Sequence, residues 1–414
     1  MSSEWLRHHP FMLAMSFIAP ILAAAIMPLF FRPQIRKRIG RWQWPLIVLT
    51  YFVTRIVLWY IVFIATDARP NFNDWRFFHW NAHEILQGKL ILGLSPLNHI
   101  FEISACLVWD NPASTILAFI LVDALCLCLL CKLARISVGE RSAPEVAWLW
   151  AINPAAWIIT VRYGQDETPV CFFLLLCAYL YMRQSKWWQP ILLSLGVLSS
   201  KITIAAGMFV IWTYSRFKMR DAAVALVTLL VVFVPLIALR ADFLITWRNL
   251  KDPLCGISIP TVIDRMVTLG VYTRMMHDIG SILAVALVLL VCFICHKRNL
   301  PLLECLTACL IAFLLFAPVA IKIYRLWYLG PLGLHALRTR QIGRYAIYTG
   351  LLSVFDDFSF NTYTKPAAVM YCNGVLGIAI LCMEIAYLFQ MLNVKVTKTV
   401  PEQERGAISE VSIV

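Results

Sequence analysis

The chain alternates long apolar stretches with short polar ones. Apolar runs over residues 11–31, 44–65 and 368–392 are each long enough to cross the hydrocarbon core of a bilayer, which takes about 20 helical residues. Because that core offers no water to the backbone, a single crossing segment satisfies its hydrogen bonds only as a helix. The pattern therefore predicts an all-α, polytopic integral membrane protein.

Composition agrees with this prediction. Hydrophobic residues make up 61% of the 414 residues and charged residues only 14%, which is too little charge to coat a soluble domain of this size. The net charge of +13 is assigned to basic loops that anchor the spans, since no basic face interleaved with aromatic residues indicates nucleic-acid binding. Most of the 13 cysteines fall inside apolar runs and are interpreted as small hydrophobic residues.

Basic residues between the spans predict the topology. The cluster between Arg32 and Arg41 is the densest and is placed in the cytoplasm, which puts the loop over 66–112 outside. The rule that basic residues gather in cytoplasmic loops holds through residues 187–214 only if this stretch forms two short helices, broken at 199–201. Lys201 then reaches the outer surface. The long loop over 240–280 is then external as well.

The resulting count is about 11 to 13 transmembrane helices, several of them too short for a core of about 30 Å unless they are re-entrant or buried among neighbours. One integral membrane domain over residues 1–394 accounts for the pattern, followed by a polar cytoplasmic tail over 395–414. The apolar stretch near the N-terminus is longer than the core of a cleavable signal and is interpreted as a retained helix.

Three polar segments between the apolar runs fall on the predicted outer side. They are Asn73-Asp74-Trp75 with the aromatic residues and His79 that follow, Gln165-Asp166-Glu167, and Lys322-Ile323-Tyr324-Arg325. Because the polar residues gather in external loops, they predict a site that acts at the membrane surface.

The order of these segments resembles the GT-C membrane glycosyltransferases. The first loop has an acid followed by aromatic residues and Leu86-Gln87-Gly88, and Asn153-Pro154 precedes Gly164-Gln165-Asp166-Glu167. The resemblance covers about residues 50 to 330 and is greatest for the polyprenyl-phosphate-mannose-dependent branches, which include the GPI and phosphatidylinositol-mannoside mannosyltransferases. It implies a GT-C-like fold with extracytoplasmic loops forming the site, and Asp74 as the catalytic base.

Such a reaction requires cations at the donor phosphate and a base at the acceptor hydroxyl. We expect Lys201, Lys322 and Arg325 to hold the phosphate and Asp74 to take the proton in a single, inverting displacement. The remaining expected substrate-binding residues are Trp75, His79, Gln165, Asp166, Glu167 and Tyr324. The first loop lacks an Asp-x-Asp pair, so a divalent metal is doubtful and no cofactor is expected.

Each assignment has a structural alternative. Asp74 could pair with Arg76 or cap the following helix, and the acids at 166 and 167 could cap the next one. The three cations could be interfacial anchors. His79, His83 and Glu84 suggest a metal site, but the sequence identifies no further ligands.

The leading hypothesis is therefore a hexosyltransferase, and within the family it resembles a mannosyltransferase. Its partners would be a polyprenyl-phosphate-linked sugar donor, a lipid or glycan acceptor and membrane lipids. It would reside in a prokaryotic plasma membrane or the endoplasmic reticulum membrane, with an extracytoplasmic or lumenal active site. The alternative is a multi-span transporter or flippase, with Asp123, Asp166 and Lys201 along its pathway. Asp123, alone in an apolar span, could instead be bonded between helices.

Overall fold

A computed structural model describes residues 14–65, 74–89, 97–184, 188–198, 205–238, 254–356 and 367–393. Within these ranges the protein is helical apart from one pair of two-residue strands. This confirms the predicted all-α class.

The first part of the chain folds into helices joined by π-helical and 3₁₀ turns. The elements are a π turn Ala14–Ile18, α3 Ala19–Ile26, a 3₁₀ turn Met27–Phe31, α4 Pro33–Ile39, a 3₁₀ turn Gly40–Trp42, α5 Gln43–Phe52, a π turn Val53–Val57, α6 Leu58–Tyr60 and a π turn Ile61–Ala65. The predicted span over 44–65 is thus one unbroken helical path with two π segments.

The middle of the chain carries two of the polar segments. Its elements are α7 Asp74–Leu86, α8 Asn98–Val108, α9 Pro112–Ser137, a 3₁₀ turn Glu140–Ser142, α10 Ala143–Ile152, α11 Pro154–Trp157, a π turn Ile158–Arg162 and α12 Glu167–Met182. Proline at the first helical position fits the starts of α9 and α11, where its missing N–H costs no bond. Asn111 and Asn153 cap these two helices through their side-chain oxygens.

The remaining elements carry the third polar segment. They are α13 Trp188–Leu198, α14 Ala205–Thr213, α15 Lys218–Ala238, β1 Cys255–Gly256, α17 Ile259–Met266, α18 Thr273–Lys297, α19 Leu302–Phe316, β2 Val319–Ala320, a 3₁₀ turn Lys322–Arg325, α20 Leu326–Arg338, α21 Ile342–Val354 and α23 Ala367–Asn393. Helices α13 and α14 agree with the prediction of two helices over 187–214. Lys201 and the expected tail over 395–414 lie outside the described residues.

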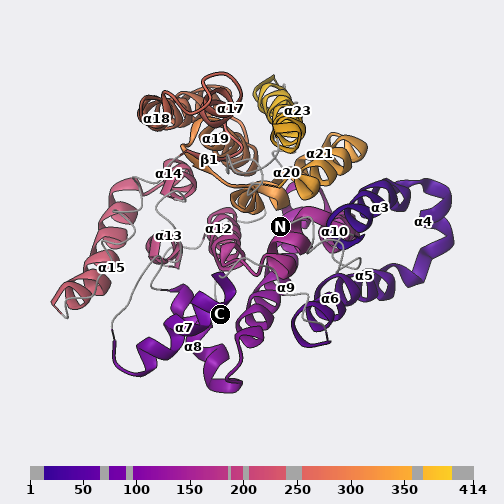
Figure 1. Cartoon of the computed structure of the whole chain (residues 1–414), viewed down its shortest axis with the longest axis horizontal. Helices are drawn as coiled ribbons and strands as arrows, with labels where there is room; N and C mark the ends of the chain where they lie inside the picture. The colour runs from indigo at the N-terminus through magenta and orange to yellow at the C-terminus, as the bar shows by residue number, and fades with distance from the viewer. Residues whose placement is uncertain are drawn as a thin grey trace, which may run out of the picture.

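Figure 1 shows the central helices α9, α10 and α12 flanked by three groups. The α3–α6 group lies to the right, α13 and α15 to the left, and α17–α23 at the top, while α7 and α8 lie together below α12. The largest hydrophobic core includes residues of α10, α12, α19 and α20.

Four helical segments among the described residues are long and apolar enough to span a membrane. They are Pro33–Ala65, Pro112–Ser137, Thr273–Lys297 and Ala368–Asn393. Three shorter apolar helices accompany them: Ala19–Phe31, Glu167–Met182 and Leu302–Phe316. The structure is therefore consistent with an integral membrane protein, and the count of 11 to 13 spans stays a prediction. Helix α20, expected to be too short to cross alone, is buried along most of its length.

The strand pair fastens the segment after residue 253 to the end of α19. β1 and β2 pair in parallel, with Gly256 opposite Ala320. Gly256 has φ of +89°, and a Cβ there would lie 2.2 Å from the carbonyl carbon of Ala320. Only glycine fits this position without displacing the backbone.

The interior carboxylate of Asp123 is paired with an arginine. Asp123 of α9 accepts from Arg55 Nε at 3.1 Å, from the Tyr51 hydroxyl at 2.9 Å and from the Trp150 indole at 3.1 Å. Arg55 also donates to the carbonyls of Trp150 and Ala151. Asp123 is thus bonded between helices, as one of its two sequence interpretations predicted.

Candidate active site at the start of α12

The segment over 164–167 forms the turn that begins α12. Gly164 has φ of +58°, a left-handed conformation that suits glycine and lets the chain reverse after the π turn Ile158–Arg162. Gln165, Asp166 and Glu167 follow it, and all three side chains are buried. Asp166 occupies the N-cap position, but its side chain makes no capping hydrogen bond to α12. A capping role therefore does not explain why the Asp166 carboxyl group is buried at this position.

Helix α8 supplies a partner for Asp166 that the sequence did not single out. Asn98 donates from Nδ2 to Asp166 Oδ2 at 3.0 Å. One turn further along α8, Glu102 is buried and pairs with His99 Nδ1 at 2.7 Å. Burial raises the pKa of the Glu102 carboxyl above its usual value, while the hydrogen bond to His99 opposes this shift. Helix α8 therefore adds three polar residues to the group of buried polar side chains at the start of α12.

The 3₁₀ turn Lys322–Arg325 meets this region from the other end of the chain. The Lys322 ammonium lies 4.6 Å from the centre of the ring of Tyr163, the residue that precedes Gly164 in the chain. It also donates a hydrogen bond to the carbonyl of Phe355. An aromatic ring attracts a cation that lies over its face. Two of the three predicted segments thus converge, although about 160 residues separate them in the sequence.

A hydrogen bond between two buried side chains joins α12 to α20. Trp327 donates from its indole nitrogen to Glu167 Oε2 at 2.6 Å. The Tyr324 ring stacks on the Trp327 ring, with centroids 4.9 Å apart and planes inclined by 17°. Glu167 is therefore fixed by an aromatic pair, which restricts how far its carboxylate can move.

Arg325 has a different environment from Lys322. Its guanidinium is fully buried, donates to Glu384 Oε1 at 2.7 Å, and also donates to the carbonyls of Ile257 and Ala320. Tyr328 and Tyr348 donate to the same Glu384 oxygen at 2.6 and 2.8 Å. Arg325 therefore holds α23, β1 and β2 together, and its donors already have partners.

The third predicted segment lies on α7. This helix begins at Asp74 and packs against α8 and α9, so it adjoins the helix that bonds Asp166 (Figure 1). The side chains of Asp74 and Trp75 lie outside the described part of the structure. His79, also predicted to bind substrate, contacts Asp110 Oδ1 from Nε2 at 3.1 Å, and burial lowers the pKa of its ring.

The structure thus brings together the segments over 163–167 and 322–327, and places α7 next to α8 beside them. The sequence did not single out Asn98, His99 and Glu102. A polar residue on a short amphipathic helix could face solvent or another part of the chain, and the sequence alone does not show which. Asn98 and Glu102 are four residues apart and so share a helix face, a pattern that could have flagged them together.

Comparisons with known proteins identify no relative: no protein-family model, curated protein or solved structure matches this chain.

Proposed function

We propose that the protein is an inverting membrane glycosyltransferase that moves a hexose from a polyprenyl-phosphate donor to a lipid or glycan acceptor. The observation that carries the proposal is the meeting of a buried Gly-Gln-Asp-Glu turn with a lysine-bearing turn and with Asn98 of α8. Acidic, cationic and amide groups in one place are the groups that such a transfer requires. The order of motifs that resembles the GT-C enzymes adds to this support.

In this proposal Lys322 contacts the donor phosphate. Its ammonium lies over the Tyr163 ring and donates to the carbonyl of Phe355, so it would exchange that carbonyl for a phosphate oxygen. A charge-assisted bond to phosphate contributes about 1.5–3 kcal/mol. Lys201 is proposed as a second cation on sequence grounds. Arg325 instead stabilises the 3₁₀ turn that carries Lys322, because withdrawing it from Glu384 would leave a buried carboxylate without its counter-ion.

Asp74 is proposed as the general base. The acceptor oxygen attacks the anomeric carbon as its proton passes to the Asp74 carboxylate, and the bond to the phosphate oxygen breaks so that polyprenyl phosphate departs. One displacement inverts the anomeric centre. Asp166, held by Asn98, would orient the acceptor or donor hydroxyls, and Tyr324 and Trp75 would offer flat faces to the sugar ring.

The rival hypothesis of a transporter is less well supported. It required Asp123 to line a pathway, but Asp123 is occupied by an arginine, a tyrosine and a tryptophan. Releasing it for each transport step would leave Arg55 uncompensated in the interior. A glycosyltransferase needs no such rearrangement.

The test compares three conservative variants in the purified full-length protein. Asp74→Asn, Asp166→Asn and Glu167→Gln are assayed with polyprenyl-phosphate-linked hexoses and a membrane lipid extract, and the products are identified by mass. A general base typically contributes about 10²- to 10⁴-fold, so turnover by Asp74→Asn should fall by at least about 10²-fold, and by less in the other two if they only orient substrate. Near-normal turnover by a monodisperse Asp74→Asn protein would transfer the role of base to Asp166.

The donor contact is tested by Lys322→Gln, with Lys297→Gln as the matched control. Lys297 is an exposed lysine at the end of α18, on the predicted cytoplasmic side. Loss of a charge-assisted phosphate bond should raise the donor concentration needed for half-maximal rate by roughly 10- to 150-fold. An equal and small change in both variants would contradict the assignment. If no donor is turned over by the wild-type protein, the proposed function itself is wrong.

A further inference from the structure

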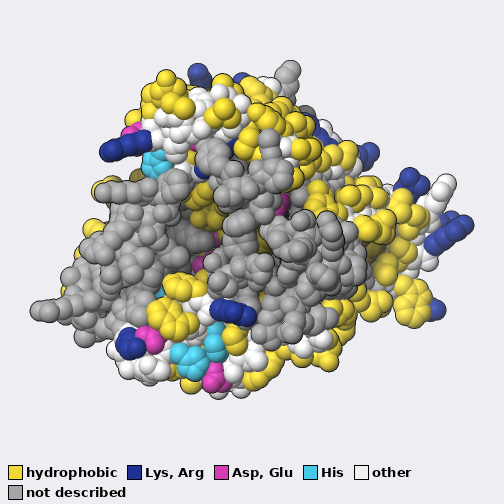
Figure 2. Space-filling model, in the orientation of Figure 1, with side chains coloured by type: hydrophobic (Ala, Val, Ile, Leu, Met, Phe, Trp, Pro, Cys, Tyr) yellow, Lys and Arg dark blue, Asp and Glu magenta, His cyan; other side chains and the backbone are white. Residues whose placement is uncertain are grey.

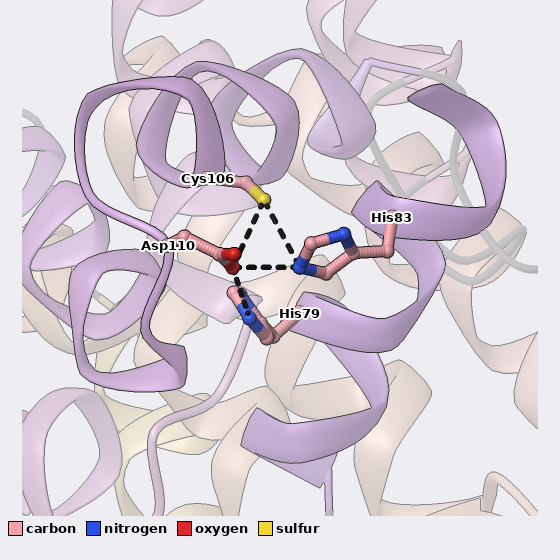
Figure 3. Close-up of side chains that lie close together, drawn as sticks. All are labelled: His79, His83, Cys106 and Asp110. Atoms are coloured by element: carbon pink, nitrogen blue, oxygen red, sulfur yellow. Dashed lines mark hydrogen bonds and ion pairs between the residues drawn. The ribbon is translucent and has the colours of Figure 1, made fainter. Parts of the chain in front are cut away.

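Helices α7 and α8 bring four side chains with metal-binding atoms to one point. They are His79 and His83 of α7, Cys106 of α8, and Asp110, which follows α8 (Figure 3). Their ligand atoms all lie within 4.8 Å of one another. The two histidines are four residues apart on α7 and so lie on one face of that helix, while Asp110 is brought to Cys106 by the extended residue Trp109 that follows α8.

The individual distances are near those of a tetrahedral zinc site. His83 Nε2 is 2.6 Å from Asp110 Oδ1, and His79 Nε2 is 3.1 Å from the same oxygen. Cys106 Sγ is 3.7 Å from His83 Nε2 and 3.9 Å from Asp110 Oδ1. Zinc bonds of about 2.0–2.3 Å place neighbouring ligand atoms roughly 3.3–3.6 Å apart, and each of these four separations differs from that range by less than about 1 Å.

From this geometry we propose that His79, His83, Cys106 and Asp110 bind a zinc ion. A thiolate, two imidazoles and a carboxylate form a ligand set that suits zinc, whereas magnesium and calcium prefer oxygen ligands alone. One thiolate and one carboxylate together balance the charge of a divalent ion. Since four protein ligands fill a tetrahedron, the site is structural and ties α7 to α8.

The surroundings allow an ion to enter from solvent. The Asp110 side chain is 68% exposed and that of His83 38%, while Cys106 forms the buried floor of the cluster. Figure 2 shows histidine and acidic side chains side by side at the lower edge of the molecule, over α7 and α8. The cluster therefore combines an open side with a buried thiol, an arrangement that favours binding over a purely internal contact.

Glu84, the third residue of the metal site that the sequence suggested, does not belong to the cluster. Its carboxylate pairs with Lys89 at 2.6 Å. The sequence identified no further ligands for His79 and His83 because the other ligands lie on another segment, Asp110 being 27 residues from His83. Zinc binding at this site does not require glycosyltransferase activity, but it makes His79 a zinc ligand in place of the substrate-binding role expected from the sequence.

The environment of His79 limits the affinity of the site for zinc. The Nδ1 atom of His79 is buried and has no hydrogen-bond partner among the described residues. Zinc-binding histidines usually donate from this second nitrogen, and loss of such a partner typically weakens binding by about 10- to 100-fold. We therefore expect zinc affinity weaker by this factor than that of a site with both histidines supported.

The test uses full-length protein in detergent, stripped with a chelator and then titrated with zinc chloride or cobalt chloride. Bound zinc is measured by elemental mass spectrometry after desalting, and cobalt by its thiolate charge-transfer and tetrahedral visible bands. We expect about one ion per chain, with cobalt bands typical of four-coordinate nitrogen, oxygen and sulfur ligation. His83→Gln should lower affinity by more than 10-fold, and Cys106→Ser should abolish the charge-transfer band.

Two control variants identify the site. Glu84→Gln leaves the four ligands in place and should bind zinc as the wild type does. Cys305→Ser removes a member of the other group of candidate ligands among the described residues, Cys292, Cys305 and Cys309, and should retain the cobalt spectrum. Absence of stoichiometric metal in the monodisperse wild-type protein would overturn the proposal, as would a cobalt spectrum that survives Cys106→Ser and is lost in Cys305→Ser.

Discussion

The carboxylates of this protein occur in two contrasting environments. Glu384 and Asp123 lie in the interior, where each is bonded to an arginine and to two aromatic side chains that donate hydrogen bonds. Asp110 lies at the rim of the molecule, where its neighbours are two histidines and a cysteine. The interior carboxylates have complete sets of donors, whereas Asp110 sits among other groups that can bind a metal.

This contrast separates structural polar groups from candidate ligand-binding ones. The buried carboxylates of Asp123 and Glu384 each have an arginine counter-ion and two further hydrogen-bond donors, so their partners are committed. A solvent-facing cluster remains stable without such a commitment and can exchange its contacts for a ligand. Arg325 and Lys322 are two buried cations of one turn with different partners: Arg325 is bonded to Glu384, while Lys322 donates to the carbonyl of Phe355 and lies over the Tyr163 ring.

The largest effect is expected from breaking an interior pair. Glu384→Gln keeps the size of the side chain but leaves Arg325 as a buried charge without its counter-ion, which should cost about 3–5 kcal/mol of unfolding free energy. Denaturation of the purified protein in mixed micelles by sodium dodecyl sulfate measures this change. The matched control Glu140→Gln, at an exposed acid before α10, should be nearly neutral. Equal stability of both variants would show that the interior pair is no different from a surface acid.

A smaller effect is expected from zinc at the rim. A ligand that binds only the folded state at 100 times its dissociation constant stabilises by about 2.7 kcal/mol. The thermal unfolding midpoint of the wild-type protein should therefore rise with zinc and return after chelation, and that of Cys106→Ser should not respond. A zinc response of the same size in Cys106→Ser would place the effect elsewhere in the molecule.

Two tryptophans donate hydrogen bonds to different kinds of acceptor, one to a carboxylate and one to a backbone carbonyl. Trp327→Phe removes the donor to the buried Glu167 carboxylate and should cost about 1.5–3 kcal/mol, the range for hydrogen bonds to charged groups. Trp59→Phe removes a bond of 2.9 Å to the carbonyl of Ala113 and should cost only about 0.5–1.5 kcal/mol beyond the shared loss of ring area. Unfolding of the two variants under identical conditions gives the difference. A larger cost for Trp59→Phe would contradict the assignment of the bond to Glu167 as the stronger of the two.

The smallest effect is expected at the surface pair of Glu84 and Lys89. Lys89 is more than half exposed, and an exposed ion pair contributes about 0–1 kcal/mol. Lys89→Gln should therefore change stability very little and leave zinc binding unchanged. A loss of zinc binding in this variant would indicate that Glu84, once released, competes with Asp110 for the histidines.

Helix class and several helix positions could be predicted from the sequence. The apolar runs over 44–65 and 368–392 became helical segments close to those bounds, because apolar length and backbone hydrogen bonding leave one outcome in a bilayer. Two separate helices over 187–214 were also predicted, from the placement of positive charge, and the structure describes α13 and α14 there. The number of spans could not be established this way, since helices such as α20 are apolar because they are buried in protein.

By itself the sequence determined the all-helical class, the apolar helical segments over 44–65 and 368–392 and the polar segments that carry candidate chemistry. The tertiary structure decided which polar groups are partners: Arg325 with Glu384, Asp166 with Asn98, and His79 with Asp110. The physical reason is the difference between properties that are local in the sequence and contacts that form only in three dimensions. Apolar length and charge are local properties of the chain, whereas a hydrogen bond or ion pair needs two atoms within about 3 Å, and here the paired residues are separated by tens of positions that only packing brings together.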